Sequence, residues 1–292
     1  MTPSLLAHGA ASGTDAIPPW QPAPLVIVGA AIALGLFWQA FARLRRRGRS
    51  DLAPWWRLAA FVAGVTLGVL AVISPLDGVA EEQLVSAHML QHVLVGDLVP
   101  ALLVVAVSGP LIWLSTPRPL LRAVHRAPRL RVAVAFVTRP AASFAIWAGA
   151  IAVWHVPAAY EAALAQPLLH DLEHATFFLG GILVWLQLVD PARRRALSPL
   201  GRIGYAVCLL AAGGALVNVL VFGNALYPSY ASAGERVLDL GPAADQQAAG
   251  MVMLVEQWLT VGAFVVVVIV RRTSQVVGTG RPLAAGEHPL SL

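Results

Sequence analysis

The sequence predicts an all-α integral membrane protein: a bundle of seven transmembrane helices with its N-terminus outside and its C-terminus in the cytoplasm. Of the 292 residues, 58% are hydrophobic and only 12% are charged, and the mean hydropathy is +0.72. Soluble domains have about twice that charged fraction. Apolar stretches that recur along the chain, and arginines confined to alternate loops, support the same fold.

Seven stretches are apolar for roughly the 20 residues that a helix needs to cross about 30 Å of hydrocarbon. In order, they cover residues 25–42, 55–74, 88–113, 141–156, 169–189, 203–222 and 248–270. The fourth is short and needs its flanks to span. Helix-breaking residues separate the stretches in the order Pro54, Ser74-Pro75, Pro117 with Pro119, Pro140, Pro157, Asp190-Pro191 and Pro228.

Arginine placement gives the orientation, because positive residues concentrate in cytoplasmic loops. All 20 basic residues are arginine, and all but Arg236 fall within residues 43–57, 118–139, 193–202 and 271–281. We therefore expect an external arm at 1–24, a membrane domain at 25–272 and a disordered cytoplasmic tail at 273–292. The first twenty residues lack the features of a signal peptide, so the first span is expected to be retained.

Two connections have features of their own. Residues 115–139 alternate leucines with arginines, so this loop is either a short amphipathic helix on anionic lipid or a solvated basic loop. Residues 223–247 form the longest external connection and are expected to cap the outer end of the bundle.

The absence of lysine excludes three classes of protein. A P-loop nucleotide site, a pyridoxal enzyme and a retinal protein each need a lysine. The sequence pI near 10.3 reflects the topology signal of the arginines, so nucleic acid is not expected as a partner. The expected surroundings are a lipid bilayer.

Five of the eight histidines are predicted at the outer membrane face: His88, His92, His155, His170 and His174. His88 with His92 and His170 with His174 are i, i+4 pairs, so each pair lies on one helical face. Two such faces can share one ion, and burying several imidazoles without a partner is costly. A single histidine on an apolar helix is more often a packing residue, which is the competing interpretation of His155.

Other donors stand nearby. Met251 and Met253 enter the last span from the outer side, and thioether with imidazole favours Cu(I), although methionines usually fill space. Glu173 is a candidate ligand, a carboxylate that orients an imidazole, or a surface acid. Asp97 and Glu256 are carboxyl groups inside the membrane. Asp97 is expected about 13 Å deeper than His88 along the same helix. Its candidate roles are a relay, a ligand in a second site, and a buried acid paired with a neighbouring helix.

The single cysteine excludes chemistry that needs two or more thiols. Cys208 is the only cysteine and lies within the sixth span, so the chain has no disulfide, no thiolate cage and no Cys-x-x-Cys motif.

With these residues the sequence resembles the seven-span assembly factors of caa3-type cytochrome c oxidase. The shared features are Ser86-Ala-His-Met-Leu-Gln-His92, Gly96-Asp97 with Pro100 and Ser108-Gly-Pro110, Trp154-His155-Val-Pro157, His170-Asp-Leu-Glu-His174, and Asp245-Gln-Gln with Gly250. They cover about residues 75–270, and their order on successive spans is more specific than any one of them.

The resemblance implies a non-catalytic role in maturing the oxidase, with oxidase subunits as partners and copper as the metal handled. Because the family is bacterial, it also implies a location in the bacterial plasma (inner) membrane. It implies that the residues that handle the metal are His88, His92, His155, His170 and His174. Met251 and Met253 are added only on their chemistry, and Asp97 matches a motif without a role.

Two alternatives come from other classes. His170-x-x-Glu173-His174 matches the H-x-x-E-H pattern of zinc proteases, which favours an intramembrane zinc hydrolase with Glu173 as general base. Histidines on neighbouring helices are also typical of a b-type haem electron carrier. A transporter is disfavoured because no pair of broken helices occupies corresponding halves of the chain.

Overall fold

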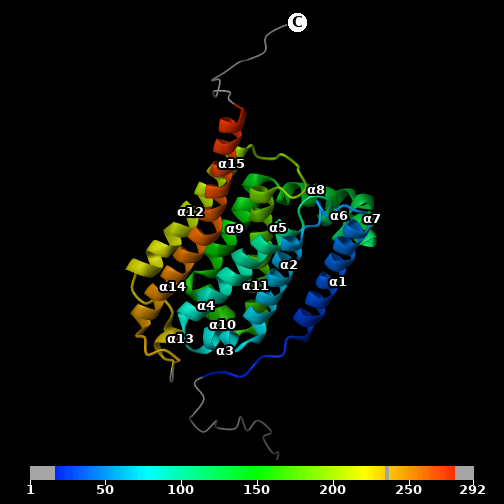
Figure 1. Cartoon of the computed structure of the whole chain (residues 1–292). Coiled ribbons are helices and arrows are strands. Elements are labelled where there is room, and N and C mark those ends of the chain that lie inside the picture. The colour runs from blue at the N-terminus through cyan, green and yellow to red at the C-terminus, as the bar shows by residue number, and fades with distance from the viewer. Residues whose placement is uncertain (1–16, 234–236, 280–292) are drawn as a thin grey trace, which may run out of the picture.

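The structure is a computed structural model that describes residues 17–233 and 237–279. Within these residues it contains helices and no strand (Figure 1). The helices are α1 (Pro24–Arg46), α2 (Trp55–Ile73), α3 (Pro75–Glu82), α4 (Val85–Val93), η1 (Leu94–Leu98), α5 (Val99–Ala106), α6 (Pro110–Ser115), α7 (Arg118–Arg126), α8 (Pro128–Val137), α9 (Pro140–Trp154), α10 (Pro157–Ala165), α11 (Pro167–Val189), α12 (Pro199–Phe222), α13 (Pro228–Ala231), α14 (Pro242–Gln257), η2 (Trp258–Gly262) and α15 (Ala263–Thr279).

The predicted all-α membrane fold is confirmed. Six described helical segments are long and apolar enough to cross a membrane, and the pair α8 and α9, bent by 74°, supplies the seventh crossing if it is counted as one span. The third and last crossings are composite, because Val85–Ala106 contains η1 and Pro242–Val270 contains η2. Both η1 and η2 are single π-helical turns, which occur often at functional sites.

Some predicted boundaries are wrong. The third span ends at Ala106 and not at residue 113, because Gly109 adopts φ +73° and turns the chain before α6. Arg57 donates a hydrogen bond to the carbonyl oxygen of Ser108 and holds this turn against α2. At the other end of the chain, α15 continues to Thr279, past the boundary expected at residue 272. The rest of the expected tail, residues 280–292, and residues 1–16 of the expected arm lie outside the described residues.

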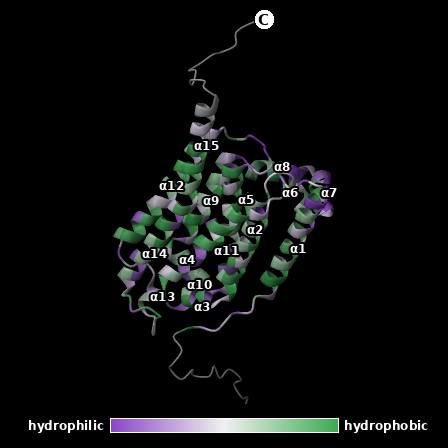
Figure 2. Cartoon of the chain, viewed as in Figure 1, coloured by the Kyte–Doolittle hydropathy of each residue, from purple (hydrophilic) through white to green (hydrophobic). Residues whose placement is uncertain are grey.

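The arginine-rich loops and the two histidine pairs lie at opposite ends of the bundle. Helices α6, α7 and α8 lie at the upper end in Figure 1, whereas α3, α10 and α13 lie at the lower end. Figure 2 colours α7 strongly hydrophilic against mostly hydrophobic spans. The 115–139 connection thus contains the helices α7 and α8, as the interpretation of it as an amphipathic helix required. Which end faces the cytoplasm stays a prediction.

Close packing positions the helices that carry the histidines. Helix α4 packs against α3 and α14, and α11 packs against α9, η1 and α5. Gly181 of α11 faces Gly96 of η1 so closely that a Cβ at position 181 would lie 2.0 Å from the Gly96 carbonyl oxygen. These two glycines let the backbones of α11 and η1 touch, one to two turns from the histidines.

Candidate metal centre

Four histidines from two helices meet at the lower end of the bundle. His88 and His92 project from α4, and His170 and His174 from α11. The ring centroids of each i, i+4 pair are 4.2 Å apart. Across the two helices, His88 lies 5.3 Å from His170 and His92 lies 5.3 Å from His174. One ligand nitrogen from each ring falls within 4.8 Å of all the others, so the predicted faces do converge.

The start of α4 is fixed by a carboxylate from another helix. Asp245 of α14 is fully buried, and its oxygens accept hydrogen bonds from the backbone nitrogens of Val85 at 2.7 Å and Ser86 at 3.0 Å. The Ser86 hydroxyl donates to the same carboxylate at 2.5 Å. A negative charge at the N-terminus of a helix satisfies its free amides and complements its dipole. Asp245 therefore anchors the turn from which His88 projects.

A tyrosine fixes the protonation of His88. Tyr230 of α13 donates its hydroxyl proton to the carbonyl oxygen of Ala80 at 2.5 Å, so the hydroxyl oxygen must accept from His88 Nδ1 at 2.7 Å. Burial, together with nearby carboxylates, raises the pKa of Tyr230 well above its usual value and keeps it protonated. His88 Nδ1 then carries the ring proton, which leaves the Nε2 lone pair facing the cluster.

A carboxylate orients His170 in the same way. Glu81 of α3 accepts a hydrogen bond from His170 Nδ1 at 2.8 Å. Nε2 of His170 and Nε2 of His174 are buried and have no hydrogen-bond partner in the described part of the chain. Such carboxylate–histidine pairs are the usual support of metal-ligating imidazoles.

Glu173 places a carboxylate inside the cluster. Its side chain is 0% exposed, Oε1 lies 3.6 Å from His92 Nε2, and neither oxygen accepts a hydrogen bond from any described residue. A buried carboxylate without compensation is costly. A cation between the histidines would compensate it.

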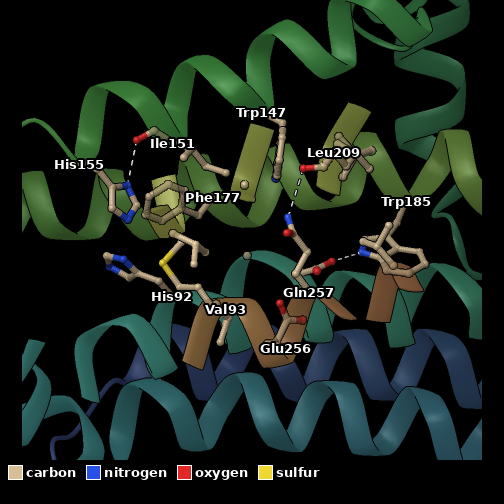
Figure 3. A pocket seen from close by; sticks show the side chains of 17 residues that line it. His92, Val93, Trp147, Ile151, His155, Phe177, Trp185, Leu209, Glu256 and Gln257 are labelled. Carbon is tan, nitrogen blue, oxygen red and sulfur yellow. Dashed lines mark hydrogen bonds between the residues drawn. The ribbon is translucent and has the colours of Figure 1, made fainter. Parts of the chain in front are cut away.

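The fifth predicted histidine lies beside the cluster and is not part of it. The ring of His155, at the end of α9, is 6.4 Å from that of His92 and outside the group of four. Its Nδ1 donates to the Ile151 carbonyl oxygen at 2.9 Å, and its Nε2 is buried without a partner among the described residues. His92 and His155 form one end of a cavity of about 80 Å³, whose other end reaches Trp185 and Glu256 (Figure 3).

The membrane carboxyls belong to this cavity. Asp97, in the π turn η1, accepts hydrogen bonds from Trp185 Nε1 and from the hydroxyl of Thr260 in η2, the latter at 2.8 Å. Glu256 lines the same cavity beside Asp97. Asp97 is thus paired with neighbouring helices and separate from the four histidines.

The two methionines are not gathered at the four-histidine cluster. Met251 is 46% exposed on α14, and Met253 lines the deeper cavity with His92 and His155. The structure adds three residues that were not singled out as site residues: Glu81, Tyr230 and Asp245. Tyr230 lies in the 223–247 connection, which does cap this end of the bundle as expected.

Fold and site together define a class: a multi-span helical membrane protein with a buried, carboxylate-supported histidine cluster at one end of its bundle. The chain belongs to the cytochrome c oxidase caa3 assembly factor family, whose model matches residues 35–275 and so includes every residue of the cluster. The resemblance found in the sequence is confirmed. Comparisons with curated proteins and with solved structures found no match.

Proposed function

We propose that this protein acts in cytochrome c oxidase assembly by holding a copper ion, as Cu(I), in the four-histidine cluster and passing it to an oxidase subunit. Membership of the assembly factor family supports the role in assembly. The copper step rests on the convergence of His88, His92, His170 and His174.

The cluster has the dimensions of a site for one ion. Metal–imidazole bonds are about 2.0–2.1 Å long, so nitrogens around one ion lie at most about 4.2 Å apart. The observed limit of 4.8 Å needs only a small contraction. His88 Nε2 and His92 Nε2 are 2.7 Å apart, the distance of a hydrogen bond, and a bound ion would replace the proton between them.

The arrangement also suits release. His170 and its partner Glu81 lie at the rim, where the Glu81 side chain is 39% exposed, and His174 is only half-buried. His88 and Glu173 lie fully buried behind them. An ion would therefore enter and leave on the side of Glu81 and His174, the more exposed side of the cluster, where a docked oxidase subunit would receive it.

Copper binding by the purified protein tests this proposal. We expect close to one equivalent of Cu(I) in the unaltered protein and almost none after His88, His92, His170 and His174 are all changed to alanine. His125→Ala, at the opposite end of the bundle, is the matched control and should bind like the unaltered protein. Equal copper in the fourfold variant and the control would refute the metal site.

The oxidase provides the functional test. Cells without this protein should contain oxidase that lacks copper, and the four-histidine variant should not restore it. Oxidase complete in copper and haem in those cells would refute the role in delivery.

One observation keeps the zinc hydrolase as a second candidate: Glu173 lies against the ligands, as a general base would. Four histidines, however, fill a tetrahedral site, and a hydrolytic zinc needs an open position for water. Glu173→Gln should therefore abolish no hydrolytic activity, whereas the loss of its negative charge beside the ion should weaken metal binding. A b-type haem is disfavoured because rings 4.2 to 5.3 Å apart leave no slot for the macrocycle, and a Soret band would reverse this judgement.

A further inference from the structure

A second cavity lies at the arginine-rich end of the bundle, opposite the end that holds the four histidines. Its volume is about 310 Å³, and it is enclosed by the start of α2, the turn before α6 and the loop that follows α11. Four arginines line it: Arg57, Arg193, Arg195 and Arg202.

The positive charge of this cavity is not balanced. Asp190 is the one acid among its lining residues, and its carboxylate is already bound by Arg202 at 3.0 Å and by the backbone nitrogens of Arg194 and Arg195. Arg57, Arg193 and Arg195 form no ion pair with any residue in 17–233 or 237–279.

Arg57 in particular lacks a partner for part of its guanidinium. One terminal nitrogen donates to the carbonyl oxygens of Leu52 and Ser108, whereas Nε is buried and meets no acceptor in the described structure. A buried cationic donor without an acceptor is unfavourable, and an anion in the cavity would satisfy it.

The loop that carries the other arginines is held in an unusual conformation. Asp190, Arg193 and Arg195 have φ of 52°, 54° and 56°, the left-handed region that residues with a Cβ avoid. Pro191 ties the loop to the turn before α6, because its carbonyl oxygen accepts from the Gly109 nitrogen at 2.8 Å. Backbone strain of this kind clusters where a ligand is held.

An apolar cavity of about 150 Å³ adjoins the basic one, and the two share Asp190 and Pro191 as walls. Side chains of α6 and of the membrane-spanning α11 line it, including Ile112, Trp113 and Leu186. A basic cavity that is large enough for a phosphate group and an apolar slot therefore meet beside the end of α11.

We propose that these two cavities together bind one anionic phospholipid, with its phosphate against Arg57, Arg193 and Arg195 and an acyl chain along Ile112 and Leu186. Basic pockets between helix ends are suited to anionic headgroups, and arginine matches the geometry of phosphate. A free phosphate ion would use the same arginines but would leave the apolar slot empty.

Native mass spectrometry of the delipidated full chain in detergent tests the proposal, with phosphatidylglycerol, phosphatidylcholine and inorganic phosphate added separately. We expect phosphatidylglycerol to bind and phosphatidylcholine not to bind. In a thermal unfolding measurement on the same samples, only phosphatidylglycerol should raise the melting temperature. The double variant Arg193→Asn, Arg195→Asn keeps residues that tolerate the left-handed region, and it should bind phosphatidylglycerol about tenfold more weakly per arginine removed.

The matched control is Arg118→Gln with Arg122→Gln, which removes two charges from α7 at the same end but outside the cavity; it should bind like the unaltered protein. Ala192→Trp fills the apolar slot without changing charge and should weaken lipid binding as well. Equal weakening in the control, equal binding of the two lipids, or stabilisation by inorganic phosphate that matches phosphatidylglycerol would each overturn the proposal.

Discussion

Gly181→Ala should loosen both the bundle and the metal site. The new Cβ would lie 2.0 Å from the Gly96 carbonyl oxygen and 2.8 Å from Pro100 Cγ, whereas real Cβ contacts are essentially never below 3.0 Å. Helix α11 must therefore move from η1 by at least about 1 Å, because a backbone oxygen cannot rotate away. Overpacking of this kind costs about 1–3 kcal/mol, and we expect the upper part of that range.

The displacement should reach the histidines. Gly96 is one turn from His92, and Gly181 is two turns from His174, so a shift of about 1 Å is transmitted along rigid helices. Metal–ligand distances vary by only about 0.2 Å between sites, so a shift of this size should weaken copper binding. Gly181→Ala should therefore lower both the stability of the fold and the affinity for copper.

Thermal unfolding in detergent and competition with a Cu(I) chelator measure the two effects. Gly214→Ala is the matched control, since no atom lies within 4 Å of its Cβ and alanine favours the helix. If Gly181→Ala melts and binds copper as Gly214→Ala does, the close approach of α11 and η1 does not position the site.

Three further changes test the supports of the cluster. Asp245→Ala removes the carboxylate that caps α4 and should lower the free energy of unfolding by about 2–4 kcal/mol, measured by denaturant unfolding in detergent. Tyr230→Phe leaves His88 Nδ1 without its acceptor and the Ala80 carbonyl oxygen without its donor, so it should weaken Cu(I) binding about 10–100-fold in chelator competition and also lower the melting temperature. Burial raises the pKa of Asp77, so the folded state holds this proton more tightly than the unfolded state does. Stability should therefore fall as pH rises from about 4 through the raised pKa, and Asp77→Asn should flatten that part of a melting-temperature profile.

Each of these changes has a control at the same end of the bundle. Asp171, on α11, is exposed, and the Asp171→Ala and Asp171→Asn variants should unfold like the unaltered protein. Tyr227 donates to the His155 carbonyl oxygen and forms no hydrogen bond with His88, so Tyr227→Phe should retain copper affinity. A Tyr230 variant that binds copper like the Tyr227 variant would contradict the role of Tyr230 in orienting His88.

The histidine faces were predictable because the rule behind them is local. A separation of four residues puts His88 above His92 on any α-helix, and the same holds for His170 and His174. That both pairs lie at one end followed from counting spans between arginine-rich loops. Their convergence on one point depends on the contact of α11 with η1, for which the sequence shows only the glycines Gly96 and Gly181.

The supports of the cluster were not predictable from spacing. Asp245 caps α4 from 160 residues away, and Tyr230 reaches His88 from 142 residues away. Glu81 belongs to a short helix that was not expected between the second and third spans. Contacts between distant segments leave no periodic signal, although Asp245 was already part of the motif that carried the family resemblance.

The π turn at Leu94–Leu98 sets the angular phase between two halves of one membrane crossing. It inserts a residue between α4, which carries the histidines, and α5, which packs against α2 and α11. If the same residues were wound as an uninterrupted α-helix, α4 would be turned by about 100° relative to α5, and His88 and His92 would point away from α11. The turn thus allows α5 to fit its neighbours while α4 keeps the direction in which its histidines must point.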